Sequence, residues 1–174
     1  MDGIWATIAD EASQESPLWA ADLRPIAERE HLPVFSPLGA DEYALGLETI
    51  YEGYLLHYGR PRLFEPADRS NGLLLGDYLY AHGLVRIAAV DPVGAVSDLA
   101  ELISLCAQAR ADGGNGDGAA WAATAALLGE GRLDEARDAL RTQRDPAPLA
   151  RLATAAVGEA RVEAALAAHR LRVG

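Results

Sequence analysis

The chain has 174 residues, of which half are hydrophobic and only 6% are aromatic. This length is enough for one domain with a hydrophobic core. The formal net charge of −11 argues against nucleic-acid binding, which needs clustered Lys or Arg to neutralise phosphates. All fifteen basic residues are arginine, so a Schiff-base lysine is excluded, and the single cysteine, Cys106, rules out an intrachain disulfide.

The sequence predicts neither a signal peptide nor a membrane span. The first residues are acidic and lack the basic start and apolar run of a signal peptide. No stretch of about 18 uncharged apolar residues occurs, so no membrane span is predicted. We therefore expect a cytoplasmic location.

Alanine and leucine dominate the apolar residues, and no segment alternates apolar and polar side chains as a half-buried strand would. This pattern predicts an all-α fold. Ser16 is expected to cap a helix that opens at Pro17, continues to Ile26 and is kinked by Pro25. Asp41 is expected to cap a later helix. The predicted helices, in chain order, cover residues 2–14, 17–26, 41–58, 69–90, 93–111, 119–129, 132–143, 147–157 and 159–171.

Two segments set the expected organisation of these helices. Residues 69–90 are apolar around most of the helix circumference, which is typical of the central helix of a bundle. Residues 113–118 are rich in glycine, which predicts a flexible linker. The sequence thus predicts a helical core at 1–112, the linker at 113–118 and a C-terminal helical subdomain at 119–174 that packs on the core.

The stretch from 48 to 110 contains a glycine-proline turn, Gly59-Arg60-Pro61, and a helix that starts Leu73-Leu74-Leu75-Gly76-Asp77-Tyr78-Leu79-Tyr80-Ala81. It resembles the trans-isoprenyl diphosphate synthase (polyprenyl synthetase) family. In that family a catalytic helix ends in Arg-Arg-Gly-x-Pro, and the next helix begins Leu-x-x-Gly-Asp-x-Leu-x-x-x-Ala. The helix break at Asp91-Pro92 matches in kind and spacing. The resemblance implies a shortened bundle of the isoprenoid-synthase kind.

The resemblance also implies a reduced metal site. The family's Asp-Asp-x-x-Asp motif, which holds Mg²⁺ on the diphosphate, falls on Glu48-Thr49-Ile50-Tyr51-Glu52. Glu48 and Glu52 are therefore the candidate metal ligands, with Mg²⁺ as the only cofactor to expect. The alternative is that these two like charges form a solvated or partly buried helix face. No second aspartate-rich helix follows in 113–174.

Two further residues take a substrate-binding role by the same resemblance, Arg60 in the turn and Asp77 on the following helix. For Asp77 the alternative is a structural carboxylate bound to a hydroxyl or an arginine. The family's paired arginines are replaced by His57 and Tyr58.

Three functions compete on these grounds. The first is a non-catalytic accessory or small subunit in isoprenoid diphosphate synthesis, paired with a catalytic prenyl synthase subunit or with a second copy of itself. The second is a helical protein-interaction module with no isoprenoid role, which predicts no elongated apolar cavity between helices 41–58 and 69–90. The third is an active prenyltransferase that uses a reduced Mg²⁺ site at Glu48, Glu52 and Asp77.

Overall fold

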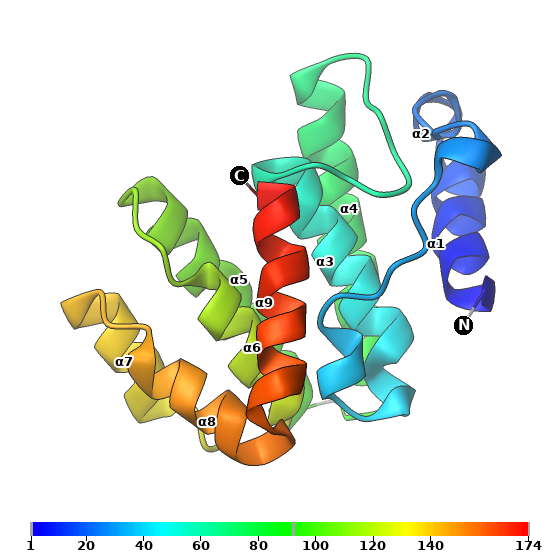
Figure 1. The fold of residues 1–174 in the computed structure, drawn as a ribbon. Coiled ribbons are helices and arrows are strands. Elements are labelled where there is room, and N and C mark those ends of the chain that lie inside the picture. The colour runs from blue at the N-terminus through cyan, green and yellow to red at the C-terminus, as the bar shows by residue number, and fades with distance from the viewer. Residues whose placement is uncertain (1, 92, 174) are drawn as a thin grey trace.

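The computed structural model describes residues 2–91 and 93–173, and this part of the chain is helical with no β-strand (Figure 1). The predicted all-α bundle is confirmed. The break predicted at Asp91-Pro92 involves Pro92, which lies outside the described residues. Within these ranges the helices are α1 (Asp2–Glu15), α2 (Pro17–Ala21), α3 (Ala44–Tyr58), α4 (Arg69–Ala88), α5 (Gly94–Ala111), α6 (Asp117–Ala126), α7 (Asp134–Gln143), α8 (Ala147–Val157) and α9 (Glu159–Val173). None of them has the length and apolar character needed to cross a bilayer.

The helix that opens at Pro17 is much shorter than expected. Ser16 caps it as predicted, because its side-chain oxygen accepts the Leu18 N–H at 3.2 Å. However, α2 ends at Ala21, and the predicted continuation through Pro25 is wrong. Leu23 instead pairs with Phe64 in an isolated antiparallel bridge. Such long-range pairing overrides the local helical pattern.

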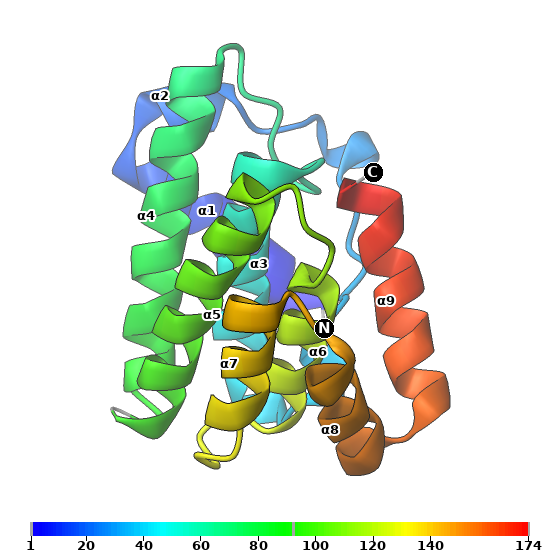
Figure 2. The same cartoon turned by 90° about the vertical axis from the view of Figure 1, so that its left-hand side faces the viewer.

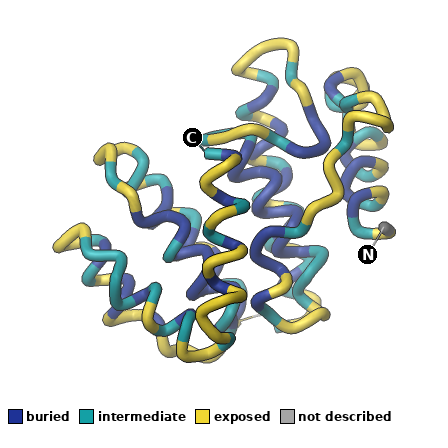
Figure 3. Tube along the Cα trace, viewed as in Figure 1, coloured by how far each residue is buried: buried dark blue, intermediate teal, exposed yellow. Residues whose placement is uncertain are grey.

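The central helix is α3, and the prediction that residues 69–90 fill this place is wrong. Ten residues of α3 are buried, whereas Leu74 and Val85 on α4 are 62% and 66% exposed. Figure 3 shows α3 in dark blue along most of its length. Asp41 does not cap this helix, because residues 41–43 form a separate 3-10 turn and the helix starts at Ala44 without a side-chain cap.

Helices α3 and α4 pack against each other in direct backbone contact, through glycines on both helices. A Cβ atom on Gly53 would lie 2.8 Å from the carbonyl oxygen of Gly76. A Cβ atom on Gly46 would lie 2.6 Å from Cδ1 of Ile87 at the other end of the contact. At these glycine positions the close contact leaves no space for a longer side chain or for a ligand between the two helices.

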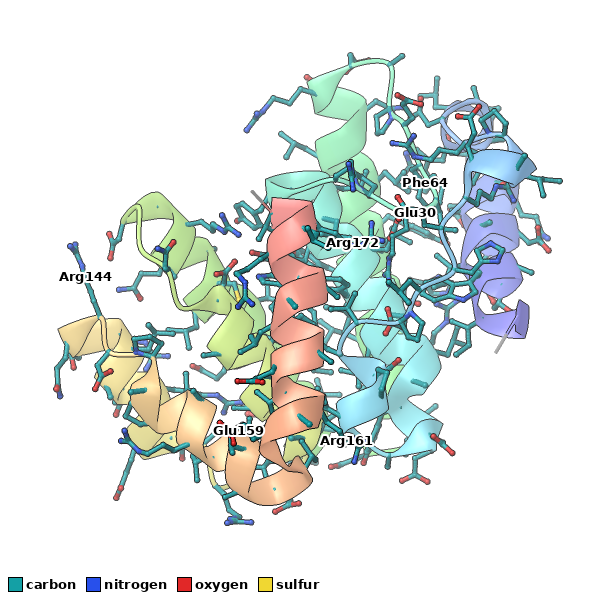
Figure 4. All side chains as sticks on the ribbon, viewed as in Figure 1. Glu30, Phe64, Arg144, Glu159, Arg161 and Arg172 are labelled. Carbon is teal, nitrogen blue, oxygen red and sulfur yellow. The ribbon has the colours of Figure 1, made fainter. Side chains whose placement is uncertain are left out.

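The C-terminal helices share one hydrophobic core with α3. Trp121 on α6 packs between Phe35 and Tyr51, with ring centroids 5.5 and 5.1 Å away. Helix α6 begins at Asp117, inside the segment predicted as a linker. Helices α7 and α8 cover the outer side of α5 and α6, and α9 runs back toward α3 (Figure 2). The last turn of α9 is held by Arg172, whose Nη2 lies 2.8 Å from Oε2 of Glu30 (Figure 4).

Candidate functional site

The two carboxylates predicted to bind magnesium lie on one face of α3 and share a buried arginine. Arg62 follows α3 in the connection to α4, and its side chain is fully buried. Its Nη1 lies 2.5 Å from Oε2 of Glu48, and its Nε lies 2.8 Å from Oε2 of Glu52. Burial by itself lowers the pKa of Arg62, but the two carboxylates outweigh it and raise that pKa above its usual value.

The other oxygen of each carboxylate accepts hydrogen bonds from backbone amides. Oε1 of Glu48 accepts from Val34 and Ser36, at 3.3 and 3.2 Å. Oε1 of Glu52 accepts from the backbone amides of Arg62 and Leu63, at 2.7 and 2.8 Å. Every carboxylate oxygen of the pair thus has a protein donor, and Glu48 and Glu52 fasten three segments of chain together.

The guanidinium of Arg62 is also enclosed by aromatic rings. It lies 4.6 Å from the ring centroid of Trp5 and 5.1 Å from that of Tyr51. Within 2–91 and 93–173, no group of three or more His, Cys, Asp or Glu side chains is arranged to hold a metal ion. Magnesium binding by Glu48 and Glu52 stays a prediction, and it would require Arg62 to leave its pocket.

The predicted substrate-binding residues lie on different elements. Asp77, on α4, is 68% exposed, and its Oδ1 lies 3.1 Å from Nε2 of His57. Arg60 is exposed, and its backbone N–H donates to the carbonyl of Arg172 at 3.0 Å. A pocket of about 270 Å³ lies nearby, lined by the turn at Gly59 and the start of α4, and neither Arg60 nor Asp77 lines it. Their role in substrate binding stays a prediction.

A second buried polar cluster joins α3, α5, α6 and α9 around Asp117, the first residue of α6. Its Oδ2 accepts hydrogen bonds from the Tyr54 hydroxyl and from Nη2 of Arg110, the latter at 2.6 Å. Nε2 of His169 lies 3.3 Å from the same oxygen, and Nδ1 of His169 lies 2.9 Å from the Tyr51 hydroxyl. Arg110 Nε also donates to the Tyr54 hydroxyl at 3.1 Å. We call these five residues the Asp117 cluster.

The environment fixes the charges of this cluster. Burial by itself raises the pKa of Asp117, but contacts with His169, Tyr54 and Arg110 outweigh burial and hold that pKa well below its usual range. Burial, with the charge of Asp117 in support, raises the pKa of Tyr54 well above its usual value. Asp117 is therefore a carboxylate and Tyr54 a neutral hydrogen-bond donor across the ordinary pH range.

A pocket of about 480 Å³ opens beside this cluster. It is the largest of the pockets described, and it lies between the end of α5, the start of α6, Pro146 and the last turns of α9. Arg110, Asp117 and His169 line it together with Arg170. Its volume lies within the range typical of small-molecule sites.

Comparison of this chain with protein-family models, with curated proteins and with solved structures finds no match. The features that bear on its function are therefore the residues of the pocket and of the Asp117 cluster.

None of the described lining residues offers a hydroxyl or thiol nucleophile. A nucleophile needs an adjacent base that can accept its proton. Tyr54 is held protonated, Asp117 already accepts several donors, and the described lining residues include no serine, threonine or cysteine. The pocket can enclose a ligand and give it directed hydrogen bonds, which is the chemistry of recognition.

Sequence reasoning missed the residues that organise both clusters. Arg62 directly follows the Gly59-Arg60-Pro61 turn, but nothing in the helical periodicity indicates that the chain folds back to place its side chain against Glu48 and Glu52. Asp117 lies in the glycine-rich segment, where the only available signal was an acidic residue ahead of an alanine-rich helix. His169 is 118 positions from Tyr51, and no local pattern joins them.

Proposed function

We propose that this chain is a non-catalytic helical binding module whose ligand site is the pocket beside the Asp117 cluster. One observation carries the proposal: the largest described pocket, about 480 Å³, opens directly onto a buried network of charged and polar side chains. A concave site with a few convergent polar groups and shifted pKa values is the ordinary form of a small-molecule site.

The non-catalytic part of the proposal has its support in the other carboxylates. The diphosphate chemistry of prenyl synthases needs Mg²⁺ on clustered carboxylates to offset charge in the transition state. In this chain Glu48 and Glu52 already neutralise Arg62, a cation that the protein itself supplies. Binding of hydrated metal ions there would require Arg62 to leave both carboxylates and the site that buries it.

A ligand screen with a pocket-filling variant tests the binding proposal. A small-molecule library balanced between acids, bases and neutral compounds is screened by thermal shift. At least one compound is expected to raise Tm by about 5 °C at a concentration of about 100 Kd, because binding only the folded state stabilises it. Ala119→Phe fills the pocket at the start of α6 and should abolish the shift.

The matched control is Ala155→Phe, which places the same ring on the exposed side of α8 and should retain the shift. Circular dichroism checks that both variants fold. If no compound of any charge raises Tm, or if Ala119→Phe responds like the wild type, the pocket is not a ligand site.

A second proposal keeps the isoprenoid role that the sequence resemblance implies, as an accessory or small subunit. The match of Gly59, Pro61, Gly76 and Asp77 to the family's motifs favours it. The glycine contact between α3 and α4 leaves no room for a prenyl chain between those helices. The chain of a prenyl diphosphate would therefore have to lie elsewhere.

Incubation with Mg²⁺ and allylic diphosphates tests the isoprenoid proposal. An accessory subunit is expected to release no pyrophosphate by itself and to co-purify with a catalytic prenyl synthase from the same cells. Pyrophosphate release by the isolated chain would instead make it an active prenyltransferase. Co-purification with unrelated proteins alone would favour the protein-interaction module.

A further inference from the structure

The pocket beside the Asp117 cluster has a charge opposite to that of the whole chain. The charged residues that line it are Arg110, Arg170 and Asp117, which sum to +1 with His169 neutral, whereas the whole chain has a net charge of −11. Arg110 is already paired with Asp117 at 2.6 Å. Arg170 has no acidic side chain within 4.0 Å among the described residues, so its charge is free for a ligand.

The Asp117 carboxylate is already paired within the protein through one of its oxygens. Its Oδ2 accepts the Tyr54 hydroxyl and Arg110, and His169 lies 3.3 Å away. The side chain of Asp117 is only 10% exposed. A ligand cation would therefore meet Arg110 and Arg170 beside this single paired carboxylate, so the charge of the pocket disfavours it.

Hydrogen-bond donors without acceptors converge on the same pocket. The first backbone bond of α6 runs from the Ala120 N–H to the Gly116 carbonyl at 3.0 Å, and no side chain caps this helix. The amides of Gly118 and Ala119, which both line the pocket, precede that bond and have no acceptor of their own. Nε2 of His169 lies 3.3 Å from Oδ2 of Asp117 but forms no well-aligned hydrogen bond, and the residue is only 3% exposed.

From these contacts we propose that the ligand of the pocket is a small organic anion, a carboxylate or a phosphate ester with a compact apolar part. This inference rests on the proposed binding function. The anionic group is held by Arg170, the free amides at the start of α6 and His169, since charged acceptors form the strongest hydrogen bonds with such donors. The apolar part lies against Pro146, Leu166 and Val173 on the other walls.

Isothermal titration with matched probes tests the ligand class. Benzoate and phenyl phosphate carry the anionic group on one ring, benzyl alcohol and benzylamine replace it with a neutral or cationic group, and inorganic phosphate lacks the ring. At least one of the two anionic ring compounds is expected to bind, and to bind at least about tenfold tighter than the alcohol, the amine and inorganic phosphate. Comparison of benzoate with phenyl phosphate decides between a carboxylate and a phosphate ester.

An arginine variant locates the charge that binds the anion. Arg170→Gln should weaken binding of the tighter anion by about fivefold, as expected for an arginine that remains partly solvated. Arg151→Gln is the matched control, because Arg151 is exposed on α8 and lines none of the pockets described. The control should bind the anion like the wild type.

The outcomes separate this inference from the function on which it rests. If a cationic or neutral compound binds and Ala119→Phe abolishes it, while neither anion binds, the pocket is a ligand site and the anion inference is wrong. If inorganic phosphate binds as tightly as phenyl phosphate, or if Arg170→Gln leaves the affinity unchanged, the inference is also wrong. If no compound of any charge binds, the binding function itself fails.

Discussion

Replacing Arg62 with methionine is expected to lower the free energy of unfolding by about 3–5 kcal/mol, and Tm by about 10 °C. The variant removes the cation between Glu48 and Glu52, which are 1% and 0% exposed, and leaves two buried negative charges on adjacent turns of α3. The loss arises from these unpaired charges more than from the attraction that the ion pair itself supplies. Urea unfolding monitored by circular dichroism measures it.

Two comparisons make the Arg62 experiment decisive. Arg60→Met changes an exposed arginine two positions earlier and should alter stability by no more than about 0.5 kcal/mol. The triple variant Arg62→Met, Glu48→Gln, Glu52→Gln removes both carboxylate charges and should recover most of the loss. If Arg62→Met alone unfolds at the same urea concentration as the wild type, the buried ion pair does not hold the fold.

Asp117 should make the stability of the protein depend on acid. The pKa of this carboxyl is well below its usual value of 3.8 in the folded state, so folding is favoured by its charged form. The contribution is fully present above the unfolded pKa and is lost as pH falls from about 4 toward the folded pKa, by about 1.4 kcal/mol per pH unit. Asp117→Asn should therefore cost about 2 kcal/mol at pH 7 and progressively less below pH 4.

The measurement is the difference in unfolding free energy between wild type and Asp117→Asn at pH 7, 4 and 3. Asp134→Asn is the matched control, because the side chain of Asp134 is 89% exposed on α7. Its difference from the wild type should be small and should not change with pH. A constant difference for Asp117→Asn across the same pH values would contradict the proposed ionisation.

The features of the fold that depend on near neighbours could be predicted from the sequence. The end of the helix before Gly59-Arg60-Pro61 and the Ser16 cap both follow from residues a few positions apart, and both agree with the structure. The extent of α2 could not be predicted. It depends on the pairing of Leu23 with Phe64, and two segments so distant in sequence leave no periodic signal.

The difference between local and long-range contacts also explains how much of the candidate sites could be predicted. The spacing of Glu48 and Glu52 correctly places both carboxylates on one helix face. Whether that face binds a metal, water or an arginine depends on the loop that follows α3, whose path is set by tertiary contacts. The position of α4 was predicted wrongly because its apolar residues surround the helix in sequence, whereas in the structure Leu74 and Val85 are exposed.

The contact between Tyr51 and His169 joins parts of the polypeptide that lie 118 positions apart. A state in which α9 detaches while the other helices remain folded would open this contact and uncover the tyrosine and tryptophan rings beneath it. Such partial opening would dismantle the pocket before the rest of the fold is lost. Any molecule bound there would thus stabilise the packed position of α9, and its release would increase the hydrogen exchange of the amides of that helix.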